Sequence, residues 1–341
     1  MNIAVLVEGG LVETLQTTPL LRTLASGVEE AHLTLVGPRV AAQLSGSLPG
    51  VDQVVTLRAL DDDGASPLAL LSAWRELRRR RFEVAILCSG SARVRLLVYL
   101  AGIQRRIASF GGLSTSLLSE YVAARRGENN AETWLRLASA MDVDAELHEL
   151  AFDPGPDARR RAEAALLGGG LEDGRLLVAV APGTGYAEGA AAAAGWEPER
   201  YAHLCNQLSA RHGAGVIVLG TESDRAAVDL LLLDLGAPSI DLSGELTLLE
   251  VAAVLERCDL FIGGDSPLLQ LAAGVGTAAV GLFGATDGRR RGPYGAAHRV
   301  VQAVDGRSPT RRARELIGTG GQPLLSKIRV DDVLAGIEAA L

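Results

Sequence analysis

Cysteine is scarce in this sequence, and none of it stands in a metal-binding spacing. The three cysteines, Cys88, Cys205 and Cys258, are scattered along 341 residues, are odd in number and form no CxxC pair. This usage excludes a disulfide-stapled fold and the common zinc motifs, and it predicts a reduced, cytoplasmic protein. Two of the three lie in apolar segments, where we expect them as small core residues.

The sequence also lacks long apolar runs and a positive net charge. Its first ten residues, MNIAVLVEGG, place no basic residue before a short apolar run, which fits neither a signal peptide nor a membrane span. The formal net charge is -8, so nothing draws the whole chain to nucleic acid or to an anionic membrane. The arginine clusters at residues 78–81 and 289–291 are by default solvated surface. A weak peripheral contact at the inner face of the membrane stays open.

Two familiar nucleotide-binding motifs are absent as well. No G-x-G-x-x-G opens the first expected helix and no GxxxxGK[ST] occurs, which argues against a nicotinamide enzyme and a P-loop NTPase. None of the five histidines falls in a loop that carries a candidate motif, and the sequence shows no metal-ligand cluster. We therefore expect no metal and no cofactor.

What the sequence does contain is a repeated alternation of short apolar runs and helical patterns. Hydrophobic residues make up 48% of the chain, which is enough for more than one core. Strands that alternate with helices indicate βαβ units and parallel sheets, so the predicted fold class is α/β. The expected strands cover residues 3–7, 33–36, 54–57, 84–88 and 106–108 in the first half, and residues 177–181, 216–219, 260–262 and 278–282 in the second.

A turn-rich stretch, FDPGPD at residues 152–157, divides the two halves. We expect a Rossmann-like N-terminal domain over residues 1–155 and a Rossmann-like C-terminal domain over residues 156–322. Residues 323–341 are expected as a C-terminal amphipathic helix that can pack back toward the N-terminal domain. Since doubly wound sheets bind ligands beyond the carboxyl ends of their strands, a cleft between two such domains is the default site.

Glycine-rich loops with hydroxyl or carboxylate side chains follow the strands of the second half. They are PGTG at residues 182–185, GTESD at 220–224, GGDS at 263–266 and FGATD at 283–287. Small residues let backbone N–H groups approach a phosphate closely. One such loop is weak support, because ordinary turns also favour Gly, Ser and Asp. Four in one domain favour a phosphate-binding site.

Several motifs follow one another in a fixed order along nearly the whole chain. They are TTPLLR at residues 17–22, FEVAI at 82–86, LAGIQRRI at 100–107, WEPERY at 196–201, DS at 265–266 with LAAG at 271–274, VGLFGATD at 280–287 and GPYG at 292–295. In this order they resemble the motifs of glycosyltransferase family 9, the heptosyltransferase family.

The resemblance implies a GT-B fold, in which an N-terminal acceptor domain and a C-terminal nucleotide-sugar donor domain face a central cleft. It also implies inverting transfer of a heptose-like sugar from an ADP-linked nucleotide diphosphate sugar. The acceptor would be a saccharide or glycolipid in lipopolysaccharide or surface-glycan biosynthesis. No metal is expected, because helix N-termini and cationic side chains stabilise the diphosphate leaving group.

The resemblance assigns the catalytic base to Glu13. The family has an aspartate four residues before its TTP motif, and Glu13 stands at that position here. As a general base, Glu13 would take the proton from the acceptor hydroxyl that attacks the anomeric carbon. From position alone, Glu13 also fits an acidic residue in a first helical turn, stabilised by the helix dipole.

The resemblance assigns donor contacts to Thr184, Glu222, Asp265, Ser266 and Gln270. Ser266 and the helix N–H groups would hold phosphate oxygens, Asp265 would order the loop or the sugar, and Glu222 suits ribose hydroxyls. Each position also has an ordinary explanation: helix capping for Asp265, Ser266 and Glu222, and a plain loop threonine for Thr184.

The centre of the donor motif departs from the family pattern. Ala194, Pro267 and Gln270 stand where the family has Lys, Gly and His. Loss of a lysine beside a diphosphate costs about 3 kcal/mol of transition-state stabilisation. The arginine run that includes Arg289 and Arg290 supplies candidate phosphate cations, against the default of a solvated basic loop.

Two classes of function follow from these departures. The first is an active glycosyltransferase. The second is a catalytically degenerate relative that acts as a binding or scaffold module, which the missing lysine and Pro267 favour. A sugar-nucleotide epimerase of the same architecture has no support beyond the shared fold. An enzyme turns over its donor when an acceptor is present, whereas a degenerate relative does not.

Overall fold

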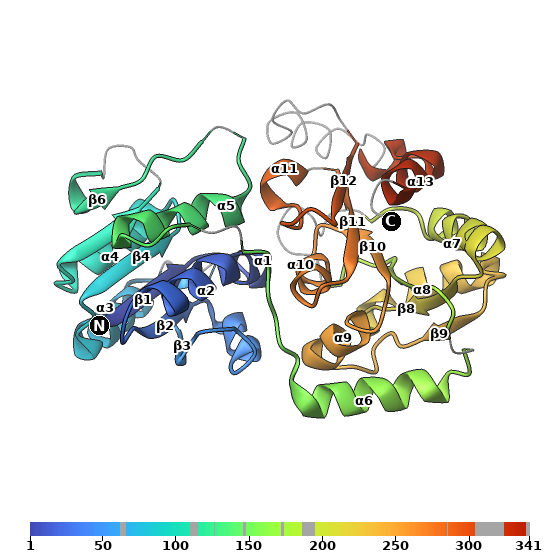
Figure 1. The fold of residues 1–341 in the computed structure, drawn as a ribbon, viewed down its shortest axis with the longest axis horizontal. Helices are drawn as coiled ribbons and strands as arrows, with labels where there is room; N and C mark the ends of the chain where they lie inside the picture. Colours follow the sequence, from blue (N-terminus) through green and yellow to red (C-terminus); the bar gives the residue numbers. More distant parts are fainter. Residues whose placement is uncertain are drawn as a thin grey trace. The chain divides into compact units, whose positions relative to one another are not determined.

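The computed structural model describes residues 1–61, 66–109, 115–125, 127–145, 148–171, 174–185, 195–284, 286–303 and 324–338. The chain divides into two compact units, Met1–Asp153 and Pro154–Leu341. Figure 1 colours the first unit from blue to green and the second from green to red. Both units are parallel sheets with helices packed on them, as the alternating pattern of the sequence predicts.

The first unit is built on a six-stranded parallel sheet with the strand order β3-β2-β1-β4-β5-β6. The central strand β1 pairs with β2 on one side, where Ile3 lies opposite Leu33, and with β4 on the other, where Ile3 lies opposite Val84. A strand with neighbours on both edges and helices on both faces is apolar along its length. The strands are β1 (Asn2–Val7), β2 (His32–Gly37), β3 (Gln53–Thr56), β4 (Val84–Cys88), β5 (Arg105–Ala108) and β6 (Glu120–Tyr121).

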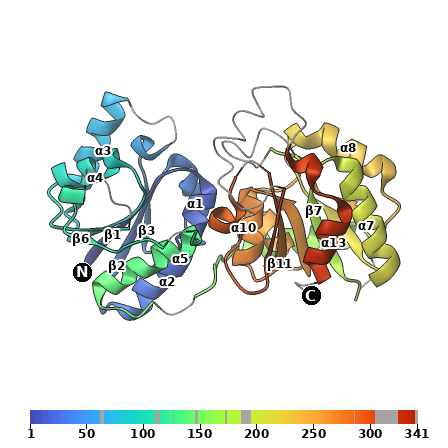
Figure 2. The ribbon, with the colours of Figure 1, turned by 90° about the horizontal axis from the view of Figure 1, so that it is seen from above.

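Helices cover both faces of this sheet. Figure 2 shows α3 and α4 on one side and α2 and α5 on the other. The helix α3 begins where the Ser66 side chain accepts a hydrogen bond from the Ala69 N–H and Pro67 takes the first helical position. The helical segments are α1 (Leu11–Gln16), α2 (Thr18–Gly27), η1 (Arg39–Leu44), η2 (Arg58–Leu60), α3 (Pro67–Arg80), α4 (Ala92–Leu100), η3 (Thr115–Leu117), α5 (Asn130–Leu135) and η4 (Arg136–Met141).

The second unit repeats the plan, with the strand order β12-β11-β10-β7-β8-β9. Here β10 pairs with β7 on one side and β11 on the other. The strands are β7 (Leu177–Ala181), β8 (Gly215–Val218), β9 (Ser239–Asp241), β10 (Leu260–Gly264), β11 (Ala278–Phe283) and β12 (Arg299–Gln302). The helical segments are α6 (Gly155–Gly168), α7 (Pro198–His212), η6 (Glu222–Asp224), α8 (Arg225–Asp234), α9 (Leu248–Leu255), α10 (Pro267–Gly274), α11 (Gly288–Arg291), η7 (Leu324–Lys327) and α13 (Val330–Glu338).

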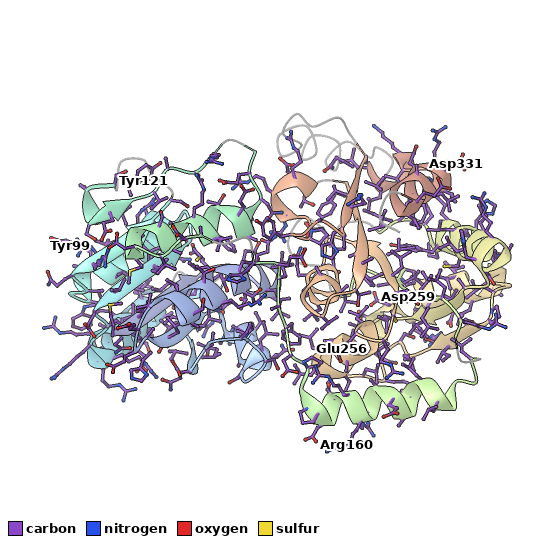
Figure 3. The ribbon with its side chains drawn as sticks, viewed as in Figure 1. Tyr99, Tyr121, Arg160, Glu256, Asp259 and Asp331 are labelled. Atoms are coloured by element: carbon purple, nitrogen blue, oxygen red, sulfur yellow. The ribbon has the colours of Figure 1, made fainter. Side chains whose placement is uncertain are left out.

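Two helix layers complete this unit. Side chains of α7, α8 and α13 share one core with β7, β8, β10 and β11. The helices α6 and α9 lie against each other, and Arg159 of α6 pairs with Glu256 at 2.7 Å. Glu256 is labelled in Figure 3, on the side of the unit where α6 lies. This layering explains the long apolar runs of the central strands, because both of their faces are covered.

The expected fold class is confirmed, and all nine expected strands are present. The sequence reasoning missed β6, β9 and β12. These three are short strands at sheet edges, and none of them carries a continuous buried run. An edge strand has a neighbour on one side only, so the apolar signal that reveals a central strand is weak.

The C-terminal helix belongs to the second unit. The side chains of Val333, Leu334 and Ile337 on α13 are buried in the second core, against β11, β12 and α7. Packing of the expected segment 323–341 toward the N-terminal domain stays a prediction. The unit boundary falls at residues 153/154, two residues before the expected 155/156.

The three cysteines are buried and unbridged, as the core interpretation expects for two of them. Burial raises the pKa of Cys205 and of Cys258 to about 12, so both thiols stay neutral at physiological pH. Across the described ranges, no helix is both long and apolar enough to cross a membrane. In the same residues, no group of His, Cys, Asp and Glu side chains could hold a metal ion.

Candidate active site

Each sheet has one point at which the strand order reverses. In the first unit it lies between β1 and β4, and in the second between β7 and β10. In doubly wound sheets, ligands bind outside the carboxyl ends of the strands at such a switch point. The candidate ligand-binding loops are therefore those after β1 and β4 in the first unit, and those after β7 and β10 in the second.

The loop after β10 brings a carboxylate and a hydroxyl to the start of α10. Asp265 and Ser266 are both buried, and Ser266 is the N-cap residue of α10. Its hydroxyl makes no capping hydrogen bond, so N-capping by the Ser266 side chain does not explain this residue. Pro267 occupies the first helical position, where a missing N–H removes no intrahelical bond.

Asp265 is engaged on one oxygen only. Its Oδ2 accepts a hydrogen bond from Arg291 Nε at 2.8 Å. Its Oδ1 is buried and has no hydrogen-bond partner among the residues that the structure describes. A buried acceptor without a donor costs about 1–3 kcal/mol, and more when the group is charged. Such a group marks a position that a ligand donor can satisfy.

Arg291 is the arginine of its run that reaches this loop. It ends α11, whose N-cap residue Asp287 accepts hydrogen bonds from the backbone and side chain of Arg289. Arg290 is exposed on the same short helix. The sequence analysis named Arg289 and Arg290 as candidate phosphate cations and did not single out Arg291. Nothing in a run of three adjacent arginines indicates which side chain faces the loop after β10.

Gln270 has a different position from the one its predicted role requires. Its side chain is fully buried, and Nε2 donates to the backbone oxygen of Arg291 at 2.7 Å. Gln270 thus holds the chain at Arg291 instead of facing the open side of the loop. Its Oε1 has no hydrogen-bond partner within the described part of the chain. Direct contact between Gln270 and the nucleotide-sugar donor therefore stays a prediction, and the full burial of this side chain does not support it.

The loop after β7 is tied to the loop after β8 by Asp224. This buried carboxylate accepts hydrogen bonds from the Gly185 N–H at 2.8 Å and from the Thr221 N–H and hydroxyl, each at 2.7 Å. A Cβ atom on Gly183 or Gly185 would collide with Asp224 or Thr221. The two glycines therefore permit this close approach, and Thr184 is carried between them, half-buried.

The sequence analysis includes Asp224 only within the GTESD loop, so its role in joining two loops was missed. Glu222, two residues earlier, is exposed, and none of the described residues hydrogen-bonds its carboxylate. The nearest turn contains Gly244, which has a positive φ of 75° and leaves room beside Glu222 Oε2. Glu222 therefore keeps the open position that a contact to ribose hydroxyls requires.

A charged network lies next to Glu222 at the end of β9. Asp241 accepts hydrogen bonds from the Ser243 hydroxyl at 2.6 Å and from Arg225 at 2.8 Å. Burial raises the pKa of Asp241, but the hydrogen bonds from Ser243 and the Arg225 guanidinium together hold it below its ordinary value. This carboxylate is therefore ionised at neutral pH and orders the turn that Glu222 contacts.

In the first unit, Glu13 lies over the turn between β1 and α1. Gly9 has φ +118° and Gly10 is the N-cap of α1. The Gly10 N–H donates to Glu13 Oε2 at 3.1 Å, so the Glu13 side chain caps one backbone donor at the start of the helix. A Cβ atom on Gly9 would stand 3.0 Å from the same oxygen, so this glycine leaves the carboxylate its place. The structure supports the capping role directly and places Glu13 at the switch-point edge.

A second carboxylate at this edge, Glu8, received no role from the sequence. Glu8 directly follows β1, and its Oε2 accepts a hydrogen bond from the Ser89 hydroxyl at 2.7 Å, directly after β4. Its Oε1 pairs with Arg93 of α4. Glu8 and Ser89 each directly follow a buried strand. This shared position was the feature of the sequence that could have predicted their contact.

Some motifs that carry the family resemblance have structural roles. The indole N–H of Trp196 donates to Ile328 O at 2.9 Å, and Arg200 donates to Ser326 O and Ile328 O. Trp196 also packs edge-to-face on Tyr201 with ring centroids 4.8 Å apart. The WEPERY segment thus anchors the chain that leads into α13. Residue 194, the position of the missing lysine, lies outside the described residues.

Solved structures show the class of fold. A glycosyltransferase family 9 protein from Veillonella parvula DSM 2008 matches with a TM-score of 0.82 and 22% identity, covering 99% of this chain and 96% of that chain. The Escherichia coli heptosyltransferase WaaC with ADP-2-deoxy-2-fluoro heptose matches with a TM-score of 0.71 and 17% identity, covering 100% of both chains. The two doubly wound units are therefore those of a GT-B fold.

Sequence comparison then gives the family. The family model described as Glycosyltransferase family 9 (heptosyltransferase) matches residues 70–319. Lipopolysaccharide heptosyltransferase 3 of Escherichia coli is 22% identical over 339 residues, which cover 96% of this chain and 96% of that protein. The chain belongs to glycosyltransferase family 9 and is a glycosyltransferase.

Proposed function

We propose that this glycosyltransferase moves a heptose-like sugar, with inversion, from an ADP-linked donor to a saccharide acceptor of lipopolysaccharide or surface-glycan biosynthesis. The family match and the similarity to lipopolysaccharide heptosyltransferases support the class of sugar and acceptor. The similarity to a heptosyltransferase with an ADP-heptose analogue supports the donor. The observation that carries the proposal is the half-satisfied Asp265 carboxylate beside Arg291 at the switch point of the second sheet.

The donor diphosphate is assigned to the start of α10. Ser266 has a hydroxyl that makes no cap bond, and the N–H groups of the first helical turn carry partial positive charge. Arg291 adds a full positive charge at the same loop, and its side chain is 23% exposed. Arg291 therefore supplies the cation that the family carries at position 194 and this chain does not.

Asp265 and Glu222 are assigned to hydroxyl groups of the donor. Asp265 Oδ1 needs a donor group, and a sugar hydroxyl provides one without bringing a second negative charge. Glu222 is exposed at the neighbouring loop and suits a ribose, whose two hydroxyls can both donate to one carboxylate. Asp224 acts on neither directly, since it positions the loop that carries Thr184.

Glu13 is assigned as the general base. Its carboxylate removes the proton from the acceptor hydroxyl while that oxygen forms a bond to the anomeric carbon. The bond from the anomeric carbon to the diphosphate oxygen breaks on the opposite face, so the configuration inverts and the diphosphate leaves with the electron pair. The hydrogen bond from the Gly10 N–H holds the carboxylate in place for this step. No metal or organic cofactor is assigned a role.

The first test is calorimetric titration of the purified chain with ADP, beside UDP, GDP and CMP. Selective binding of ADP supports the donor assignment, and preference for another nucleotide replaces it. Incubation with ADP-heptose and a heptose-deficient lipopolysaccharide acceptor then tests transfer, with the anomeric configuration of the product read by NMR. ADP binding without turnover would favour the degenerate binding module. Two features support that alternative: Gln270 is buried and held against the backbone of Arg291, and Pro267 stands where the family has glycine.

A further inference from the structure

An apolar groove lies on the first unit, between α3 and α4. It has a volume of about 550 Å³ and is lined by five leucines, by Trp74 and by a single charged side chain, Arg93. The groove runs between α3 and α4, which pack side by side, and the Trp74 indole N–H donates to Leu100 O at 2.9 Å. Its volume and apolar lining are typical of a surface that binds another molecule.

The surface around the groove is also apolar. Leu68 is 80% exposed and Leu100 is 53% exposed, with Leu71, Leu96 and Tyr99 exposed between them. Figure 3 places Tyr99 at the periphery of the first unit. The opposite sides of both helices already fill the core through Ala73, Leu77 and other small or branched residues. This outer face is therefore additional apolar surface, and contiguous patches of this kind mark interaction sites.

The segment that contains α3 and α4, residues 66–109, is positively charged although the whole chain is negatively charged. Residues 66–109 contain nine arginines and two glutamates, a formal charge of +7 in a chain whose net charge is -8. Glu8 and Glu120, outside this range, pair with Arg93 and Arg105 and leave an excess of +5. Among the described residues, Arg75, Arg78 and Arg81 have no carboxylate partner. The face thus combines apolar side chains with uncompensated positive charge.

Two of its aromatic rings are paired with arginines. The Arg78 guanidinium lies 5.6 Å from the centroid of Trp74, and that of Arg106 lies 5.3 Å from the centroid of Tyr99. An aromatic ring beside a long cationic side chain suits the boundary between lipid tails and headgroups. There, the ring and the stem enter the apolar layer while the charge remains at the phosphates.

We propose that the α3–α4 face docks on the surface of an anionic phospholipid bilayer. The leucines and the rings of Trp74 and Tyr99 would enter the upper acyl region, and the exposed arginines Arg75, Arg78 and Arg81 would contact phosphate headgroups. The excess of positive charge favours an anionic bilayer over an apolar protein helix. Arg93 lines the groove and also pairs with Glu8, so docking would bring the first switch point next to the membrane surface.

The test is flotation of the full-length chain with lipid vesicles, which requires no enzymatic turnover. The chain is expected to bind vesicles of phosphatidylcholine with phosphatidylglycerol and not vesicles of phosphatidylcholine alone. Binding should weaken as salt rises, because screening shortens the reach of the arginines to about 10 Å at 0.1 M. Equal binding to both vesicle types, or none to either, would overturn the proposal.

Two variants probe the two components of the face. Arg75→Gln with Arg78→Gln should weaken partitioning into anionic vesicles about 25-fold, at about fivefold per arginine. Leu71→Ser with Leu100→Ser should weaken it about tenfold or more. All four side chains are exposed, so the melting temperature should stay unchanged.

The matched control is Leu230→Ser with Leu233→Ser on α8, which removes two exposed leucines from the second unit. This control should bind vesicles like the unchanged chain. If the control loses vesicle binding to the same extent, binding depends on exposed leucines in general and not on the α3–α4 face. That result would overturn the assignment of the docking site to this face. If instead the unchanged chain ignores vesicles and forms a dimer that Leu71→Ser with Leu100→Ser dissociates, the face is a contact between two copies and the bilayer proposal is wrong.

Discussion

The two units end their central strands with different charge arrangements, although both reverse strand order at one point. At the first switch point, both oxygens of Glu8 are engaged within the protein, Oε2 by Ser89 and Oε1 by Arg93. At the second, Asp265 pairs with Arg291 through Oδ2, while the buried Oδ1 has no partner among the described residues. Two sheets of the same topology thus differ at the switch point: both oxygens of Glu8 have partners, whereas only one oxygen of Asp265 has a partner among the described residues.

This difference shows what topology contributes and what it leaves to individual side chains. A switch point supplies the edge at which loops and helix N-termini gather. Whether the edge is prepared for a ligand depends on unmet hydrogen-bonding groups, because these are what a ligand satisfies. By this criterion the second unit is prepared for a ligand through Asp265. In the first unit the remaining carboxylate is Glu13, held by the Gly10 N–H.

The largest effect is expected from Glu13→Gln. The amide oxygen of glutamine can still accept the Gly10 N–H, so the turn should fold, but an amide cannot take a proton from the acceptor. The transfer rate should fall by about 10²–10⁴-fold with ADP affinity unchanged. Rate measurements with saturating donor and calorimetry with ADP check this result. If Glu8→Gln abolishes transfer in a folded protein while Glu13→Gln does not, the base belongs to Glu8.

The next effect concerns the cation of the second unit. Arg291→Gln should lower the rate of transfer by about 10²–10³-fold and weaken ADP binding, because the developing charge on the diphosphate loses the cation that the proposal assigns to it. Arg291→Lys should restore part of both. The control is Arg290→Gln, on the same short helix and exposed, which should change ADP affinity less than twofold. Equal losses from both variants would mean that the run acts only through its summed charge.

A smaller effect is expected on stability. Gly183→Ala places a methyl group against Asp224, so the loop after β7 must shift away from the loop after β8. Overpacking of this kind costs about 1–3 kcal/mol and should lower the melting temperature. Gly168→Ala, at the end of α6 with open space around it, should be neutral or raise stability by about 0.5–1 kcal/mol. A Gly183→Ala protein that melts like the unchanged chain would remove the proposed role of Asp224.

The smallest effect is a dependence on pH. Asp241 has a pKa below its ordinary value, so its hydrogen bonds stabilise the folded protein above the unfolded pKa of about 3.9. That contribution is lost as pH falls through the lower folded pKa. Asp241→Asn should therefore be less stable than the unchanged chain at pH 7, by less than about 1 kcal/mol of unfolding free energy, and this gap should be smaller in a second measurement below the unfolded pKa of about 3.9. A gap of the same size at both pH values would contradict this account.

Much of the fold could be predicted from the sequence because its signals are local. The buried strands are continuous apolar runs, and the loops after them carry the Gly, Ser and Asp residues that turns require. The short edge strands β6, β9 and β12 escaped prediction, since pairing on one side leaves no such run. The candidate site divides in the same way. Asp265 and Ser266 were found from a contiguous motif, while Glu8 and Asp224 depend on partners from another strand.

The sequence by itself determined the α/β pattern and the division into two units. It also determined the order of motifs that resembles the family and the place of Glu13 four residues before the TTP motif. Only the tertiary structure decided which of three adjacent arginines reaches Asp265, and that Gln270 holds the chain at Arg291. The physical reason is sequence distance: Gln270 lies 21 residues from Arg291, and Glu8 lies 85 residues from Arg93. Such pairs meet only after the sheet is assembled, so no local pattern of residues specifies them.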